Sequence, residues 1–319
     1  MVKKGRKMKT LRNLAVMFVM AMTFMLTGIS ADAAGVVQTA QTQNAVTVMW
    51  QQEDDALEYY VAIGDDYTAA SSAQPVTVPA SVNSYTFRNL KPGTQYYVKI
   101  TYKYQSSYSG TIYTYPLGST DIKTLPGKVT NVNQHKWWYY SEYVDVAWDD
   151  QTGVDGFEYT VKDSKKRTYL KNASVGDGCS FKVKNNMVYS ITVRAYSMIN
   201  GQKYYGEESA TAYLFTQPMV KSAKISAGQL KIKWNKVNGV TGYDVYVSTK
   251  EKSGYKKVKS LKKSATSLTV KKLKGKKFKA NKKYYVYIVA KKKVGKRTYT
   301  SGRHYTYEAK YGRLNWTFD

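Results

Sequence analysis

Few residues in this 319-residue chain could carry out covalent chemistry. The sequence has two histidines, His135 and His304, and a single cysteine, Cys179. Metalloproteases, serine hydrolases and phosphate-binding loops are marked by HExxH, GxSxG and GxxxxGK(S/T), and none of these patterns occurs. Cys179 alternates with Phe181 and Val183, as a small apolar residue on a strand would. We therefore expect a protein without catalytic activity and without a cofactor.

Acidic residues are the remaining candidates for chemistry. Glu53, Asp54 and Asp55 form one acidic group, and Asp65 and Asp66 form another. They lack the ligand spacing of a calcium-binding loop, so an acidic turn is the simpler interpretation. A glycosidase pair of carboxylates would need a deep cleft to enclose the sugar. We expect no metal site.

An unusual aromatic run lies near the middle of the chain. Trp137, Trp138, Tyr139 and Tyr140 follow one another directly. A strand turns alternate side chains to opposite faces, so two of these four would face water unless another part of the protein covers them. Three interpretations stay open: packing between two domains, a platform that stacks on a carbohydrate, or a longer hairpin that covers itself.

Positive charge is concentrated in the last third of the chain. Residues 35–126 carry a net charge of −2 and residues 127–217 a net charge of +1. Residues 218–319 contain 28 Lys and Arg against 4 Asp and Glu, a net charge of +24. Because such self-repulsion destabilises a compact domain, we expect a polyanionic partner. Of these bases 25 are Lys and 3 are Arg, which favours diffuse, salt-sensitive attraction over a shaped phosphate pocket.

The candidate polyanion-binding residues fall into two clusters within this last third. They are Lys271, Lys272, Lys274, Lys276, Lys277, Lys279, Lys282 and Lys283 in the first, and Lys291, Lys292, Lys293, Lys296 and Arg297 in the second.

The first 34 residues predict a secretory signal peptide. A basic head is followed by an apolar run and then by the small residues Ala31 and Ala33 at a cleavage site. No second apolar run follows, so we expect no membrane span after cleavage. The C-terminus shows no sorting motif, and we expect the mature protein outside the cell, held on the cell wall non-covalently.

The rest of the chain repeats one pattern. Trp50, Trp148 and Trp234 each end an alternating stretch and lie 98 and then 86 residues apart. A later alternating stretch in each repeat opens on a tyrosine. The period-2 alternation predicts strands throughout, in a sandwich-type unit of about ninety residues. The expected core residues are Trp50, Trp148, Trp234, Tyr96, Tyr189 and Tyr284.

The repeat resembles the fibronectin type III domain, on the tryptophan strand and on the segment from Leu90 to Tyr96, LKPGTQY. The resemblance implies three tandem immunoglobulin-like β-sandwiches, at residues 35–126, 127–217 and 218–319, after the signal peptide at 1–34. The second copy departs most, with Asn186 at the motif leucine and a shortened corner. The third places Leu273 there, with a longer connection to its tyrosine. This lysine- and tyrosine-rich copy resembles modules of secreted proteins from Gram-positive bacteria.

These observations predict a secreted, non-catalytic, monomeric protein for cell-surface binding or adhesion. Its basic last module would attach to an anionic cell-wall polymer such as teichoic acid, or to an acidic glycan, with nucleic acid bound only as a non-specific polyanion. Host extracellular matrix or a protein ligand is a further possible partner. The alternative is a carbohydrate-binding accessory or spacer module that works with a carbohydrate-active enzyme.

Overall fold

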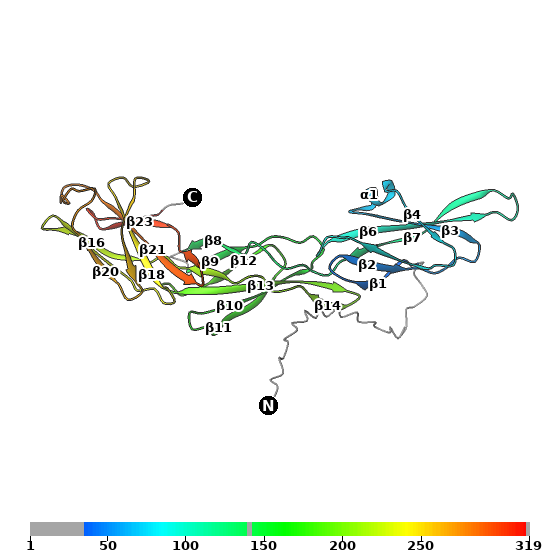
Figure 1. Ribbon diagram of the computed structural model, residues 1–319, viewed down its shortest axis with the longest axis horizontal. Helices are drawn as coiled ribbons and strands as arrows, with labels where there is room; N and C mark the ends of the chain where they lie inside the picture. Colours follow the sequence, from blue (N-terminus) through cyan, green and yellow to red (C-terminus); the bar gives the residue numbers. More distant parts are fainter. Residues whose placement is uncertain (1–34, 139–141, 317–319) are drawn as a thin grey trace, which may run out of the picture. The chain divides into compact units, whose positions relative to one another are not determined.

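Strands make up nearly all the regular structure of this protein (Figure 1). The computed structural model describes residues 35–138 and 142–316. Within these ranges it contains a single short helix, α1 (Tyr67–Ser72). The prediction of an all-β protein built from tandem sandwiches is confirmed. The predicted signal peptide, residues 1–34, lies outside the described residues.

The first sandwich has one sheet of three strands and one of four. Its core contains Trp50, Tyr59, Val98 and Ile100, all at most 3% exposed. The three-stranded sheet has the order β1 (Val37–Gln41), β2 (Ala45–Met49), β5 (Ser84–Arg88), and the four-stranded sheet the order β4 (Val76–Pro79), β3 (Ala56–Gly64), β6 (Gln95–Gln105), β7 (Ile112–Lys123).

The second sandwich repeats this plan. Trp148 packs beside Phe157 and Tyr159 in its core. One sheet has the order β12 (Gly178–Lys182), β9 (Tyr143–Ala147), β8 (Asn133–Trp138). The other has the order β11 (Thr168–Ser174), β10 (Gly156–Lys162), β13 (Val188–Ile199), β14 (Gln202–Tyr205), with β15 (Ala212–Phe215) also paired to β13.

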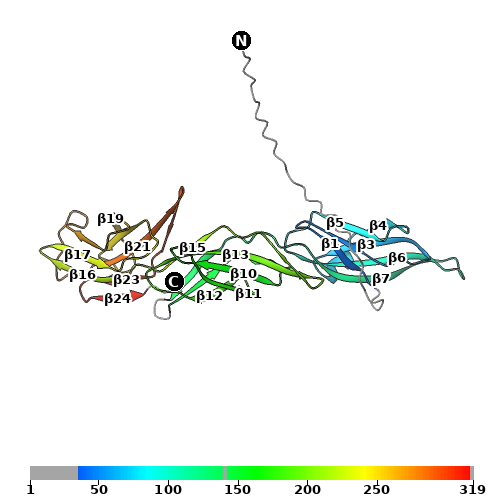
Figure 2. The ribbon, with the colours of Figure 1, turned by 90° about the horizontal axis from the view of Figure 1, so that it is seen from below.

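The third sandwich is the basic one, and its strands lie together in both views (Figures 1 and 2). Trp234 packs edge-on against Tyr243 in its core. One sheet has the order β16 (Val220–Ser226), β17 (Gln229–Trp234), β20 (Ser267–Val270). The other has the order β19 (Lys256–Lys262), β18 (Gly242–Ser248), β21 (Tyr285–Val294), β23 (Tyr305–Glu308), β24 (Arg313–Trp316), with β22 (Arg297–Thr300) also paired to β21. The exact domain boundaries stay predictions.

A tyrosine at the start of the long strand holds the same corner in all three sandwiches. Its hydroxyl accepts a hydrogen bond from the backbone N–H five residues earlier, which fixes the connection that enters the strand. The pairs are Lys91 with Tyr96 at 2.9 Å, Lys184 with Tyr189 at 2.8 Å and Lys279 with Tyr284 at 3.2 Å.

These corners correct the sequence alignment of the second and third repeats. The apolar residue six positions before the tyrosine is Val183 in one and Phe278 in the other, and both are buried. Asn186 instead occupies the position of Gly93, and both have a left-handed backbone, with φ of 60° and 59°. Asn is among the residues that tolerate this conformation. The second corner is therefore complete, and the third needs no longer connection.

The two junctions between sandwiches differ in chemistry. Buried residues of the second and third sandwiches form one continuous apolar cluster, which includes Phe215, Met219 and Val220, whereas the first sandwich has a separate core. Contacts between the first and second sandwiches are polar, such as Gly153 N–H to Gly93 C=O at 2.7 Å. We infer that the second and third sandwiches are coupled in folding.

Calorimetry of three matched Val→Ala variants tests this coupling. Val98, Val193 and Val286 are completely buried, one in each sandwich, and each substitution should cost about 2 kcal/mol. Val193→Ala and Val286→Ala should lower the same unfolding transition, and Val98→Ala a different one. Separate transitions for Val193→Ala and Val286→Ala would contradict the coupling.

Removal of one hydroxyl group tests how much the corner hydrogen bond stabilises the second sandwich. Tyr189→Phe removes the hydrogen bond to the Lys184 N–H and should lower the free energy of unfolding by about 1 kcal/mol. Tyr204→Phe in the same sandwich is the matched control, because the Tyr204 hydroxyl donates to the Gln202 side chain at an exposed position. Equal losses of stability in the two variants, measured by thermal denaturation, would show that the corner hydrogen bond stabilises the fold no more than an exposed hydrogen bond does.

Candidate binding site

The first cluster of predicted binding residues lies on one anchored segment, residues 271–283, which we call the lysine segment. Leu273 and Phe278 on it are buried, and Phe278 packs edge-on against Tyr284. Lys274 and Gly275 form a tight turn with φ of 49° and 79°, closed by two backbone hydrogen bonds between Leu273 and Lys276. Positive φ at both central residues is the type I′ geometry. The apolar anchors thus fix the backbone while the lysines project outward.

All eight lysines of the lysine segment are exposed. Lys283 has an acidic partner, the Glu308 carboxylate at 3.4 Å. The others, with no ion pair among the described residues, are Lys271, Lys272, Lys274, Lys276, Lys277, Lys279 and Lys282.

The second cluster divides into structural and exposed cations. The Lys291 ammonium lies 2.6 Å from the Asp244 carboxylate. Lys292 donates to the Gly239 carbonyl at 3.0 Å and lies 5.4 Å from the centre of the Tyr213 ring, and burial lowers its pKa. The exposed members are Lys293, Lys296 and Arg297.

A further pair of lysines was missed by the sequence analysis. Lys224 on β16 and Lys231 on β17 are directly opposite each other in the sheet register, and both are exposed. Like charges directly opposite on neighbouring strands destabilise a sheet. Only the register brings them together, so alternation within each strand could not reveal the pair.

The described acids of the third sandwich do little to neutralise its surface. Asp244 and Glu308 are 7% and 1% exposed, and each forms ion pairs with two basic side chains. Burial alone would raise the pKa of Asp244, but hydrogen bonds from Lys291 and Ser260 lower it. Glu251 is the one exposed acid among the described residues of this sandwich. The surface is therefore almost uniformly positive.

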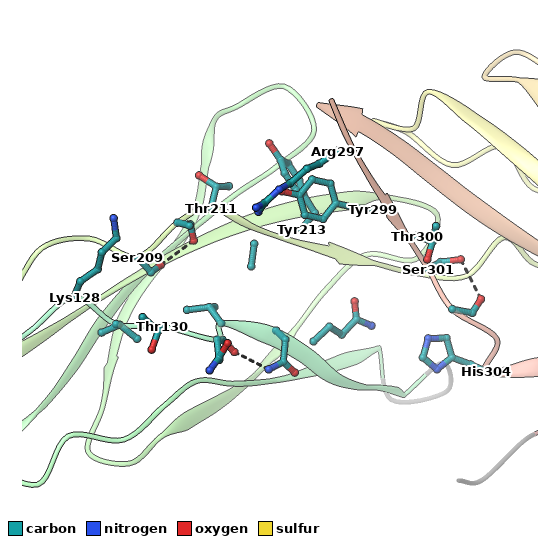
Figure 3. Close-up of a pocket in the computed structure, with 18 residues that line it drawn as sticks. Lys128, Thr130, Ser209, Thr211, Tyr213, Arg297, Tyr299, Thr300, Ser301 and His304 are labelled. Atoms are coloured by element: carbon teal, nitrogen blue, oxygen red, sulfur yellow. Dashed lines mark hydrogen bonds between the residues drawn. The ribbon is translucent and has the colours of Figure 1, made fainter. Parts of the chain in front are cut away.

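A cleft of about 700 Å³ lies where the second and third sandwiches meet (Figure 3). The Tyr213 and Tyr299 rings are 4.8 Å apart, and Figure 3 shows them beside Arg297, with His304 at another end of the cleft. Lys128 adds a second positive charge, and no acidic residue is among the described residues that line it. Aromatic rings and cations together suit an anionic, sugar-containing chain. Sequence reasoning missed this cleft because its walls are far apart in the chain.

The aromatic run does not form one exposed platform. Trp137 is 4% exposed and its ring lies 5.7 Å from that of His304 in the third sandwich. Trp138 is 41% exposed, and its indole N–H donates to the Asp145 carboxylate at 2.7 Å. The Lys136 ammonium lies over the same ring, 4.6 Å from its centre. Trp137 is thus closed to a carbohydrate, which corrects that interpretation for this residue. Tyr139 and Tyr140 lie outside the described residues.

The residues expected in the core are all buried. Their exposure does not exceed 8% in any case: Trp50, Trp148, Trp234, Tyr96, Tyr189 and Tyr284.

The described side chains offer little for catalysis. In residues 35–138 and 142–316, no group of three or more His, Cys, Asp or Glu could hold a metal ion. Burial raises the pKa of the Cys179 thiol to about 12, so this cysteine is protonated and a poor nucleophile at neutral pH. The described part of the chain also contains no helix long and apolar enough to span a membrane.

Comparison with known proteins agrees with the sandwich architecture of the first repeat. Residues 33–115 match the family model of the fibronectin type III domain, and domains of this family generally serve as non-catalytic binding or spacer modules. A solved structure of the chicken CNTN1 FN1–FN3 domains has a TM-score of 0.32 and 16% identity, covering 83% of this chain and 96% of that one. A segment of two fibronectin type III domains from chicken tenascin has a TM-score of 0.31 and 13% identity, covering 57% and 98%.

The partly buried His304 predicts a pH dependence for the junction of the second and third sandwiches. Burial lowers its pKa below the ordinary 6.5, so below pH 6.5 the unfolded chain binds a proton that the folded chain excludes. The free energy of unfolding should therefore fall as the pH drops below 6.5.

Thermal denaturation of His304→Gln between pH 7.5 and 5.5 tests this sign. The variant should lose less stability than the wild type over this interval. If His304→Gln loses as much stability as the wild type, His304 does not contribute to the acid sensitivity.

Proposed function

We propose that this protein is a secreted, non-catalytic binding protein whose third sandwich attaches it to an anionic polymer outside the cell. Teichoic acid of a Gram-positive cell wall and acidic glycans are the polymers that fit this chemistry, and the attachment is non-covalent. The first two sandwiches act as near-neutral spacers or partner-binding units.

The unneutralised positive surface of the third sandwich carries this proposal. Eleven of the thirteen predicted cations are exposed, eight on the lysine segment together with Lys293, Lys296 and Arg297, whereas Asp244 and Glu308 are buried and held in ion pairs within the sandwich. The directly opposed Lys224 and Lys231 add repulsion within a sheet. A polyanion would relieve this repulsion and release its own counterions, so its binding should weaken steeply with salt.

The cleft between the second and third sandwiches supports a glycan-containing polymer. Tyr213 and Tyr299 contribute aromatic rings to its lining, and Arg297 and Lys128 contribute positive charge. Nucleic acid would bind the surface only as another polyanion, since Lys lacks the planar, bidentate geometry of Arg for reading it.

A set of five substitutions tests the proposal in the whole chain. Lys271→Gln, Lys272→Gln, Lys274→Gln, Lys276→Gln and Lys277→Gln remove charge from the lysine segment, and Lys→Arg at the same positions retains it. Binding to an immobilised glycerol-phosphate polymer is measured from 0.1 to 1 M NaCl, with uncharged dextran as a control matrix. The Gln set should flatten the slope of log K against log salt by roughly 3.5 to 4.5, and the Arg set should leave it unchanged.

A second control separates the lysine segment from net charge. Lys162, Lys165, Lys166, Lys171 and Lys182 are exposed on the second sandwich, and their replacement by Gln removes the same total charge. This set should retain nearly wild-type binding. Equal loss in the two Gln sets, or binding that salt does not weaken, would refute attachment through the lysine segment.

A further inference from the structure

The hairpin of β6 and β7 extends past the core of the first sandwich. These strands have 11 and 12 residues, whereas β1, β2 and β5 of the opposite sheet have 5 each. Along β6, Val98 and Ile100 are completely buried, but Tyr104 on the same face is only partly buried. Figure 1 shows the end of the hairpin beyond β1 and β2. The core-facing side of one sheet thus continues where the other sheet has ended.

Tyrosines fill this uncovered face. Tyr104 pairs across the strands with Tyr113, and Tyr102 pairs with Tyr115, so all four side chains lie on one side. Tyr113 and Tyr115 are 44% and 51% exposed. The ring of Tyr104 stacks on Tyr113 with centroids 5.7 Å apart and meets Tyr115 edge-on at 5.4 Å. We call Tyr104, Tyr113 and Tyr115 the tyrosine patch.

Three carboxylates border the tyrosine patch. Glu53, Asp54 and Asp55 are exposed in the turn that leads into β3, whose first residue, Ala56, pairs with Tyr104. None of the three forms an ion pair with a described residue. The pKa of Tyr104 is raised by its burial, by the neighbouring Tyr115 and Tyr113, and by the charge of Asp55. The patch therefore combines aromatic faces with negative charge.

This chemistry selects a cationic occupant. Ammonium groups are attracted to tyrosine ring faces and to carboxylates, whereas an anionic polymer would be repelled by the acidic border. The chain itself carries a matching surface, because the lysine segment presents exposed ammonium groups with few acidic partners. A second copy of the chain is thus the occupant that charge complementarity favours.

We propose that the tyrosine patch of one chain binds the lysine segment of another, so that the protein associates head to tail. The two surfaces are different, so the contact is heterologous and can continue from copy to copy without closing. This association replaces the monomer expected from the sequence. It uses the same lysine segment as the proposed polymer attachment, so the two would compete for that segment, whereas the tyrosine patch and its acids belong to the first sandwich and take no part in polymer binding.

Sedimentation equilibrium of the chain from Gly35 tests the association. At 0.15 M NaCl the average mass should rise with protein concentration, and at 1 M NaCl, where charges are screened over about 3 Å, the chain should be monomeric. Tyr104→Ala, Tyr113→Ala and Tyr115→Ala together should weaken association at least tenfold. Tyr67→Ala, at a 59% exposed tyrosine of the same sandwich, is the matched control and should change nothing. A chain that is monomeric at 0.15 M, or a patch variant that still associates, overturns the proposal.

Mixing two defective variants tests the direction of the contact. The triple tyrosine variant retains its lysine segment, and the variant with five Lys→Gln substitutions retains its tyrosine patch. Neither should associate alone, but an equimolar mixture should form a one-to-one complex and stop there. Absence of that complex, with both variants showing wild-type thermal unfolding, overturns the head-to-tail contact.

Discussion

The hydrogen bond between the Lys279 N–H and the Tyr284 hydroxyl constrains the most highly charged part of the protein. It closes the corner at the start of β21, and Phe278 packs against the same tyrosine ring. With Leu273 also buried, the backbone of the lysine segment is fixed at three points. Eight ammonium groups can therefore be displayed on a defined surface although they repel one another. In the other two sandwiches the same hydrogen bond is present, but the segment that leads to it has no comparable run of lysines.

The acids of the third sandwich act in its interior. Asp244 holds Lys291 and Lys257, and Glu308 holds Lys283 and Arg313. A carboxylate buried without partners would carry a large desolvation cost. These four cations offset that cost for the two buried acids, and the two acids leave the charge of the other surface lysines unneutralised. The exposed cations are left available to an outside anion. The charge imbalance of the sequence thus becomes still larger on the surface of the folded domain.

The two junctions differ in how far the stability of one sandwich depends on its neighbour. The Tyr305 hydroxyl donates to the Pro218 carbonyl and accepts from the Val220 N–H, and Gln217 is completely buried beside it. The connection into the third sandwich is therefore part of a core. The first and second sandwiches meet instead through polar contacts, including Lys123 with Asp155 at 3.2 Å. Loss of the third sandwich would expose apolar surface on the second, whereas the first has a core of its own.

Local pattern alone determined the architecture. Alternation of apolar and polar residues requires only the period of a strand, and so Trp50, Trp148, Trp234 and the three corner tyrosines could be assigned to cores from the sequence. The excess of Lys over acids in the last third is likewise a matter of composition. Alignment of the corners failed where it relied on residue type, because Val183 and Phe278 fill a position that the sequence analysis gave to Asn186 and Leu273.

Tertiary structure decided everything that depends on residues far apart in the chain. Strand register placed Lys224 opposite Lys231, and the meeting of two sandwiches brought Tyr213 beside Tyr299 and buried Trp137 against His304. The unequal lengths of the two sheets left Tyr104 and Tyr113 uncovered, although their alternation reads as an ordinary strand. The period of a strand specifies which side chains share a face. Whether another element covers that face depends on where the opposing sheet ends, which no local pattern encodes.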